Sequence, residues 1–89
     1  MLRIQRSGGP EVVFSLSGRI EIEDAAELER LIRLETAGQE ISLDLGDVTL
    51  VDREALRSLA RWEAEGIKLA NCPPYIREWI EGSDGRRTG

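Results

Sequence analysis

The spacing of apolar residues changes once along residues 41–59, ISLDLGDVTLVDREALRSL, and this change constrains the fold more than any other feature of the chain. Ile41, Leu43 and Leu45 alternate with polar residues, which is the pattern of a β-strand with one buried face. From Leu56 onward, apolar residues recur at helical spacing. The segment therefore predicts a strand, a break at Gly46-Asp47 and a helix.

Asp52 stands immediately before that helix, where a side-chain oxygen can accept a hydrogen bond from an N-terminal amide. A carboxylate at this place also lies at the positive end of the helix dipole. We therefore predict that Asp52 caps a helix over about residues 53–64, and that any role in binding is secondary to capping.

The composition predicts one small soluble domain with an aliphatic core. The 89 residues are 40% hydrophobic, 33% charged and 4% aromatic, and a chain of this size buries roughly 60% of its unfolded surface. With 17 acidic and 12 basic residues the net charge is −5, which argues against a nucleic-acid partner because such binding depends on a basic face.

The cysteine and histidine content excludes several kinds of site. Cys72 is the only cysteine and the chain has no histidine, so it contains no internal disulfide, no common zinc ligand set and no Ser-His or Cys-His catalytic pair. Cys72 is interpreted as an inert small residue before two prolines. No apolar run is long enough for a membrane span or a secretory signal, so we expect a cytoplasmic protein without membrane insertion.

The other elements follow from alternation, helical spacing and turn residues. We expect Glu23 or Asp24 to cap the first helix, Ala37-Gly38 to end it and Pro74 to begin the last helix. The expected elements are a hairpin of residues 2–6 and 12–17, a helix over 24–37, parallel strands at 40–45 and 67–70, a last helix ending near Glu81, and a flexible tail over 82–89.

Three blocks of this chain resemble the STAS domain of bacterial anti-sigma factor antagonists: LSGRI at residues 16–20, LDLGDVTLVD at 43–52 and IKLAN at 67–71. The resemblance covers about residues 2–81. It implies an α/β fold with a mixed four-stranded sheet, helices mainly on one face and the order β-β-α-β-α-β-α. It also implies a single domain over residues 1–81 that binds regulatory protein partners, with no catalysis and no cofactor.

The strand-to-helix junction departs from the family pattern, which reads Asp-Ser-Ser-Gly-Leu or Asp-Ser-Thr-Gly-Leu with the second hydroxyl residue phosphorylated. Here the junction reads Asp52-Arg53-Glu54-Ala55-Leu56, so Glu54 occupies the phosphoacceptor position. The phosphorylation switch is therefore expected to be absent. Two interpretations of Glu54 stay open: permanent imitation of a phosphoserine, or simple loss of the switch.

The resemblance implies a partner-binding surface around the junction, formed by Asp47, Thr49, Asp52, Arg53, Glu54 and Arg57. The partner would be an anti-sigma factor kinase or, as the alternative, the ATPase of a membrane transporter. A nucleotide or small-ligand site at the helix N-terminus is a third possibility, against which the carboxylate of Glu54 counts because it would repel phosphate.

Two further groups of residues bear on metal binding and on docking. Asp44, Asp47, Asp52 and Glu54 could bind Mg²⁺ as oxygen ligands, but alternation sends Asp44 to the other face of the strand, so no metal site is predicted. Neither Thr49 nor Ser58 replaces the missing hydroxyl. Trp62 and Trp79 are expected to pack at the edge of the core, although an exposed Trp62 beside Arg57 and Arg61 would form a docking patch.

Overall fold

The computed structural model describes residues 2–35 and 38–84. Within them the elements are β1 (Leu2–Ser7), β2 (Glu11–Ile20), α1 (Ile22–Arg33), β3 (Glu40–Val51), α2 (Arg53–Ala64), β4 (Lys68–Ala70) and α3 (Pro74–Asp84). The strands form one sheet in the order β1-β2-β3-β4, in which β1 and β2 are antiparallel and the other two pairs are parallel. The predicted class, a mixed four-stranded sheet in the order β-β-α-β-α-β-α, is confirmed.

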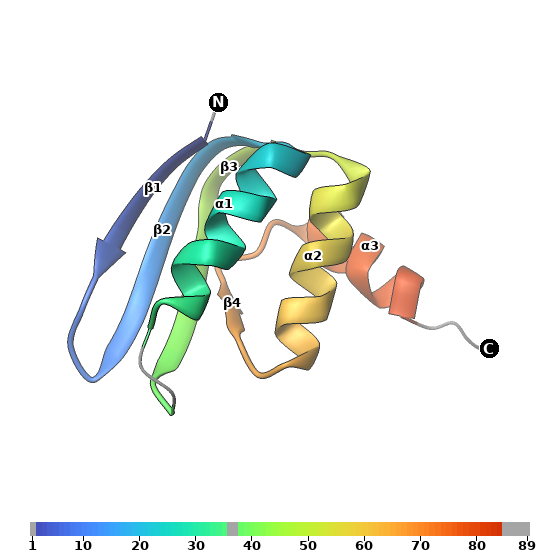
Figure 1. The fold of residues 1–89 in the computed structure, drawn as a ribbon. Coiled ribbons are helices and arrows are strands. Elements are labelled where there is room, and N and C mark those ends of the chain that lie inside the picture. The colour runs from blue at the N-terminus through green and yellow to red at the C-terminus, as the bar shows by residue number, and fades with distance from the viewer. Residues whose placement is uncertain (1, 36–37, 85–89) are drawn as a thin grey trace.

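The helices α1 and α2 lie on one face of the sheet with their N-termini at the same end of the molecule, and α3 lies beside α2 (Figure 1). The alternating residues Val12, Phe14 and Leu16 of β2 are at most 2% exposed beneath them. Each such side chain stabilises the fold by about 1.5–3 kcal/mol relative to an exposed position. The helices complete this core with Leu28, Leu59, Trp62, Ile76 and Ile80.

Both central strands are longer than the alternation pattern predicts. β3 does not end at Gly46-Asp47 but continues to Val51, and β2 continues through Gly18-Arg19-Ile20. The pairing of β2 with β3 shifts register twice, between Ser15 and Ser17 and between Gly18 and Arg19. At each shift β3 carries one additional residue, so the strand continues although its period of two is lost.

The first helix begins two residues earlier than expected and ends at Arg33. Its N-cap is Glu21, whereas the predicted caps Glu23 and Asp24 both lie in the first turn, and Asp24 Oδ2 accepts from the Glu21 N–H at 2.9 Å. Leu34, just after the helix, is 70% exposed. Gly38 has a positive φ of 88°, but it follows residues 36–37, which lie outside the described residues.

The predictions for the last two helices agree better with the structure. The bounds of α2 are those expected, and Pro74 begins α3. α3 runs to Asp84, three residues beyond the expected end near Glu81. The remainder of the expected tail, residues 85–89, lies outside the described residues.

Candidate functional site

The site is built where β3 ends and α2 begins. The N–H of Asp52 donates to the carbonyl of Ile20 at 3.0 Å, so the junction is held against the end of β2. Asp52 Oδ1 then accepts from the N–H of Ala55 at 3.3 Å, which confirms the predicted N-cap. These two bonds fix the direction in which α2 leaves the sheet.

Three charged side chains of the first turns of α2 are exposed: Arg53, Glu54 and Arg57. Glu54 Oε2 and Arg57 Nη1 are 3.6 Å apart, and about half or more of each side chain is accessible to solvent. An exposed pair of this kind contributes little to stability, about 0.3–0.5 kcal/mol. The carboxylate of Glu54 therefore remains available to a partner.

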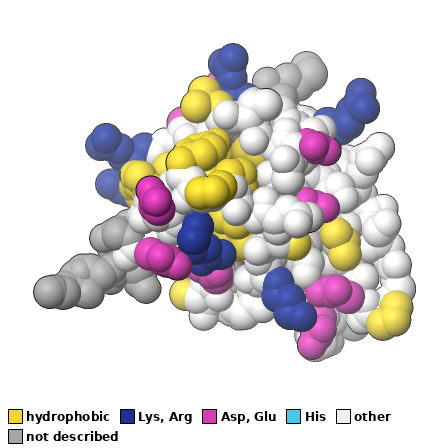
Figure 2. All heavy atoms as spheres, turned by 180° about the vertical axis from the view of Figure 1, so that it is seen from behind, with side chains coloured by type: hydrophobic (Ala, Val, Ile, Leu, Met, Phe, Trp, Pro, Cys, Tyr) yellow, Lys and Arg dark blue, Asp and Glu magenta, His cyan; other side chains and the backbone are white. Residues whose placement is uncertain are grey.

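The end of β3 adds the predicted residues Asp47 and Thr49, both exposed, to the same region. The carbonyl of Thr49 accepts from the hydroxyl of Tyr75 at 3.4 Å, which joins the start of α3 to this strand. Leu50 and Tyr75 are 51% and 47% exposed, and sequence reasoning missed both. Viewed from behind, hydrophobic side chains gather in one area of the surface (Figure 2).

The acidic residues considered as magnesium ligands have separate roles. Asp44 Oδ1 accepts from the N–H of Gly46 at 3.0 Å and from Asn71 Nδ2 at 3.1 Å, and these bonds lower the pKa of Asp44, the Gly46 bond most. Asp52 is engaged as a cap. In residues 2–35 and 38–84 there is no group of three or more His, Cys, Asp or Glu side chains arranged to hold a metal ion.

Trp62 is only 2% exposed and lies within the core, deeper than the edge position expected, so the alternative of a docking patch around an exposed Trp62 is excluded. Arg57 and Arg61 are exposed, but no tryptophan surface lies open beside them. Trp79 is half-buried and packs against the core, as expected. Burial also raises the pKa of the half-buried Cys72 thiol, so the reactive thiolate is disfavoured.

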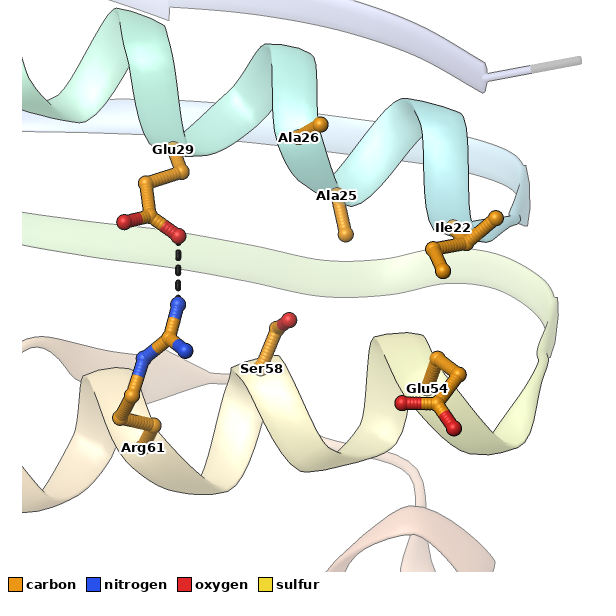
Figure 3. A pocket seen from close by; sticks show the side chains of 7 residues that line it. All are labelled: Ile22, Ala25, Ala26, Glu29, Glu54, Ser58 and Arg61. Atoms are coloured by element: carbon orange, nitrogen blue, oxygen red, sulfur yellow. Dashed lines mark hydrogen bonds and ion pairs between the residues drawn. The ribbon is translucent and has the colours of Figure 1, made fainter.

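A groove of about 240 Å³ lies between α1 and α2, with Glu54 toward one end and Glu29 and Arg61 toward the other (Figure 3). α1 lines it with Ile22, Ala25, Ala26 and Glu29, and α2 lines it with Glu54, Ser58 and Arg61. Sequence reasoning did not predict the groove. The neighbouring small residues Ala25 and Ala26 were its only local signal, since two alanines leave space against a facing helix.

One end of the groove is closed by an ion-pair network that links the two helices. Arg61 Nη2 donates to Glu29 Oε1, and Arg33 Nη2 donates to Glu29 Oε2 at 2.8 Å (Figure 3 shows the first of these contacts). The hydrogen bond from Arg33 is the main cause that lowers the pKa of Glu29, and the charge of Arg61 acts in the same direction. Glu29 thus stays ionised and holds α1 and α2 together.

Comparison with known proteins identifies the family. The family model described as "Mlab, STAS domain" matches residues 4–81. This chain belongs to the STAS domain family. No curated protein matches the sequence.

Solved structures similar to this STAS domain support the same fold. The anti-sigma factor antagonist SpoIIAA in its unphosphorylated form aligns over 100% of this chain and 87% of its own, with 16% identity and a TM-score of 0.65. An uncharacterised Shewanella loihica protein of the DUF3478 family, described as having a SpoIIAA-like fold, aligns over 98% and 81%, with 12% identity and a TM-score of 0.59.

The crystal structure of Mglu aligns over 81% of the STAS domain at 27% identity, with a TM-score of 0.57. The STAS domain spans only 19% of the length of Mglu. Among the described residues of this chain, every helix is too short or too polar to cross a membrane.

STAS domains are generally non-catalytic regulatory modules. The structure brings the predicted residues of the α2 N-terminus and the end of β3 to one end of the molecule. The groove between α1 and α2, which Glu54 lines, adjoins these residues. The region is therefore a candidate protein-binding surface.

Proposed function

We propose that this STAS domain is a cytoplasmic regulatory module that binds a protein partner through the junction of β3 and α2. The binding surface comprises Asp47, Thr49, Asp52, Arg53, Glu54 and Arg57. The module has no cofactor and performs no catalysis. Its partner is an anti-sigma factor kinase, as the resemblance to anti-sigma factor antagonists suggests.

The observation that carries this proposal is the exposed position of Glu54 in the first turn of α2. In the anti-sigma factor antagonists that this chain resembles, a phosphorylated hydroxyl residue occupies this position. A side chain at the exposed start of a helix is accessible to a docking protein, and a carboxylate has no hydroxyl for a Ser/Thr kinase to modify. We therefore propose that the surface is retained and that its phosphorylation switch is lost.

Imitation of phosphoserine is the weaker interpretation of Glu54. A phosphoserine carries about −1.5 to −2 charge and three acceptor oxygens, whereas a carboxylate carries one charge and two oxygens. Moreover, the neighbouring Arg57 already balances part of that single charge at 3.6 Å. We propose instead that Glu54 contacts the partner directly.

A second candidate partner is the ATPase of a membrane transporter. The same carboxylate at position 54 favours it, because a permanently docked subunit needs no phosphorylation to release it. Both candidates use the same surface of the STAS domain. The two candidates differ in which protein affinity capture with this domain would recover.

Affinity capture with a matched pair of variants tests the surface. Arg53→Glu reverses an exposed charge at the start of α2, and Arg3→Glu reverses an exposed charge on β1 at the far side of the sheet. Wild type and Arg3→Glu should recover the same anti-sigma factor kinase or transporter ATPase from the native extract, identified by mass spectrometry, whereas Arg53→Glu should lose it. Equal recovery by all three proteins would place the binding surface elsewhere.

The substitution Glu54→Ser separates direct contact from imitation of phosphoserine. If Glu54 contacts the partner, the substitution should weaken binding by about 1–3 kcal/mol, because a charge-assisted hydrogen bond is lost at a desolvated interface. If Glu54 imitates phosphoserine, binding should strengthen instead. Calorimetry with the captured partner gives the sign, and an unchanged affinity would remove Glu54 from the interface.

A further inference from the structure

The α1 wall of the groove consists of short or exposed apolar side chains. Ala25 points toward α2 and is 5% exposed, Ala26 is exposed, and Ile22 is 52% exposed at the N-terminal end (Figure 3). Alanine has no atoms beyond Cβ, so this wall leaves an open strip with an apolar surface. A hydrocarbon chain bound along this strip would bury its apolar surface.

The α2 wall opposite supplies a carboxylate and a hydroxyl one helical turn apart. Glu54 and Ser58 are four residues apart and so lie on one face of α2, where both line the groove (Figure 3). Among the described residues neither side chain forms a hydrogen bond, and Glu54 has Arg57 only at the ion-pair distance of 3.6 Å. Both polar groups are therefore free to receive a donor.

The two ends of the groove differ in how fully their charges are balanced. Glu29 accepts hydrogen bonds from two guanidinium groups, those of Arg33 and Arg61, and closes its end. Among the side chains of residues 2–35 and 38–81, none donates a hydrogen bond to Glu54, so acceptor capacity remains at the end of the groove where Glu54 lies. A cation that enters from this end meets a carboxylate that is not yet hydrogen-bonded.

An anionic guest does not fit, although both helices begin at this end of the molecule (Figure 1). A backbone N–H at the start of each helix already donates to a carboxylate of the chain: Glu21 N–H to Asp24 and Ala55 N–H to Asp52. These carboxylates compete with an anion for the N-terminal amides. Arg61, the cation that lines the groove, already donates to Glu29, so the groove offers little to a negatively charged guest.

We propose that the groove between α1 and α2 binds one basic side chain, lysine or arginine, of the protein partner. The aliphatic stem lies along Ile22 and Ala25, as long cationic side chains do on apolar surfaces. The cationic group donates to the carboxylate of Glu54 and to the hydroxyl oxygen of Ser58. This inference rests on the proposed function and specifies the chemistry that the partner presents to the surface.

Solution NMR of the ¹⁵N-labelled domain tests the groove without the partner. The probes are N-acetyl-lysine methylamide and N-acetyl-arginine methylamide, with N-acetyl-norleucine methylamide as the uncharged control of similar stem. Both cationic probes should give saturable amide shifts centred on Ile22, Ala26, Glu54 and Ser58. The norleucine probe should bind at least about tenfold more weakly, since it lacks the charge-assisted hydrogen bond.

Three variants make the result specific. Glu54→Gln should weaken both cationic probes about tenfold, whereas Glu23→Gln, which removes an acid from the first turn of α1 outside the groove, should leave binding unchanged. Ala26→Leu fills the groove with a good helix former and should abolish saturation. Equal binding of norleucine, equal effects of the two Gln variants, or no saturable shift would each overturn the inference.

The same variants separate this inference from the proposed function. A partner protein that is lost by Arg53→Glu but retained by Ala26→Leu would overturn the groove as a partner subsite and leave the proposed function standing. Saturable probe binding without recovery of either candidate partner by the wild type would instead contradict the proposed function.

Discussion

Asp52 and Glu54 lie two positions apart at the start of α2, and their carboxylates have different surroundings. Asp52 Oδ1 accepts from the backbone of Ala55, whereas Glu54 has only an exposed ion pair with Arg57. Helix capping explains the first residue. Glu54 gains at most about 0.3–1 kcal/mol from the helix dipole. Its ion pair with Arg57, at 3.6 Å, leaves the carboxylate oxygens able to accept a hydrogen bond from a partner.

Removal of the cap should destabilise the domain without changing its fold. We expect Asp52→Ala to lower the free energy of unfolding by about 1 kcal/mol, because the N–H of Ala55 loses its acceptor. Urea melts measure this loss. Asp47→Ala serves as the control, since it removes an exposed acid of β3 that caps no helix. Midpoints that coincide for wild type and Asp52→Ala would show that the cap contributes no stability.

At the scale of elements, local signals were sufficient for α2 and insufficient for α1 and β3. The bounds of α2 followed from a common capping residue and an unbroken helical period. The start of α1 was misplaced because its N-cap is Glu21, and glutamate is not among the favoured capping residues. Its first turn therefore offered Asp24 as the more plausible cap.

The extension of β3 and the groove could not be read from local sequence, because both depend on distant residues. The strand continues past Gly46 only because its additional residues are accommodated against β2 in two register shifts. The groove depends on the separation of two helices that are joined by Arg61 and Glu29. Of the residues that line the groove, only Glu54 on α2 was among the predicted site residues, and none of those on α1 was.

The irregular part of β3 should tolerate little added volume. A Cβ at Gly46 would lie 3.2 Å from Asp44 Oδ1 and 3.4 Å from Asn71 Cβ, so Gly46→Ala should crowd the contact between these two side chains. We expect a loss of about 1–2 kcal/mol, measured by urea melts. Gly8→Ala is the matched control, because its Cβ would meet only the flexible end of Arg6 at 3.4 Å. Equal stability of both variants would mean that the strand adjusts freely.

Across the whole molecule, carboxylates join elements that are far apart in the sequence. Glu35 accepts hydrogen bonds from Arg6 and so links the residues after α1 to β1. Glu29 links α1 to α2 through Arg61, and Asp44 links β3 to Asn71 after β4. Because one small sheet is covered by helices mainly on one face, these polar links supplement a core of limited size.

These links should make the stability of the domain depend on pH in the acidic range. The pKa values of Glu29, Glu35 and Asp44 are lowered in the folded state, chiefly by hydrogen bonds from Arg33, Arg6 and the Gly46 N–H respectively. A carboxyl whose pKa is lowered by folding binds protons more readily in the unfolded chain. Its stabilising contribution is complete above the unfolded pKa, about 4.3 for Glu and 3.9 for Asp, and is lost as the pH falls through the lower folded value.

Thermal melts between about pH 7 and pH 2 should therefore show a constant midpoint down to about pH 5 and a progressive fall below it. Glu29→Gln should reduce the slope of that fall, because one of the carboxyl groups that bind protons on unfolding is removed while the side chain keeps its size. Glu23→Gln is the control, since Glu23 is an exposed acid of α1 with no ion pair among the described residues. A slope that both variants change equally would mean that net charge, and not the link between α1 and α2, sets the acid sensitivity of the domain.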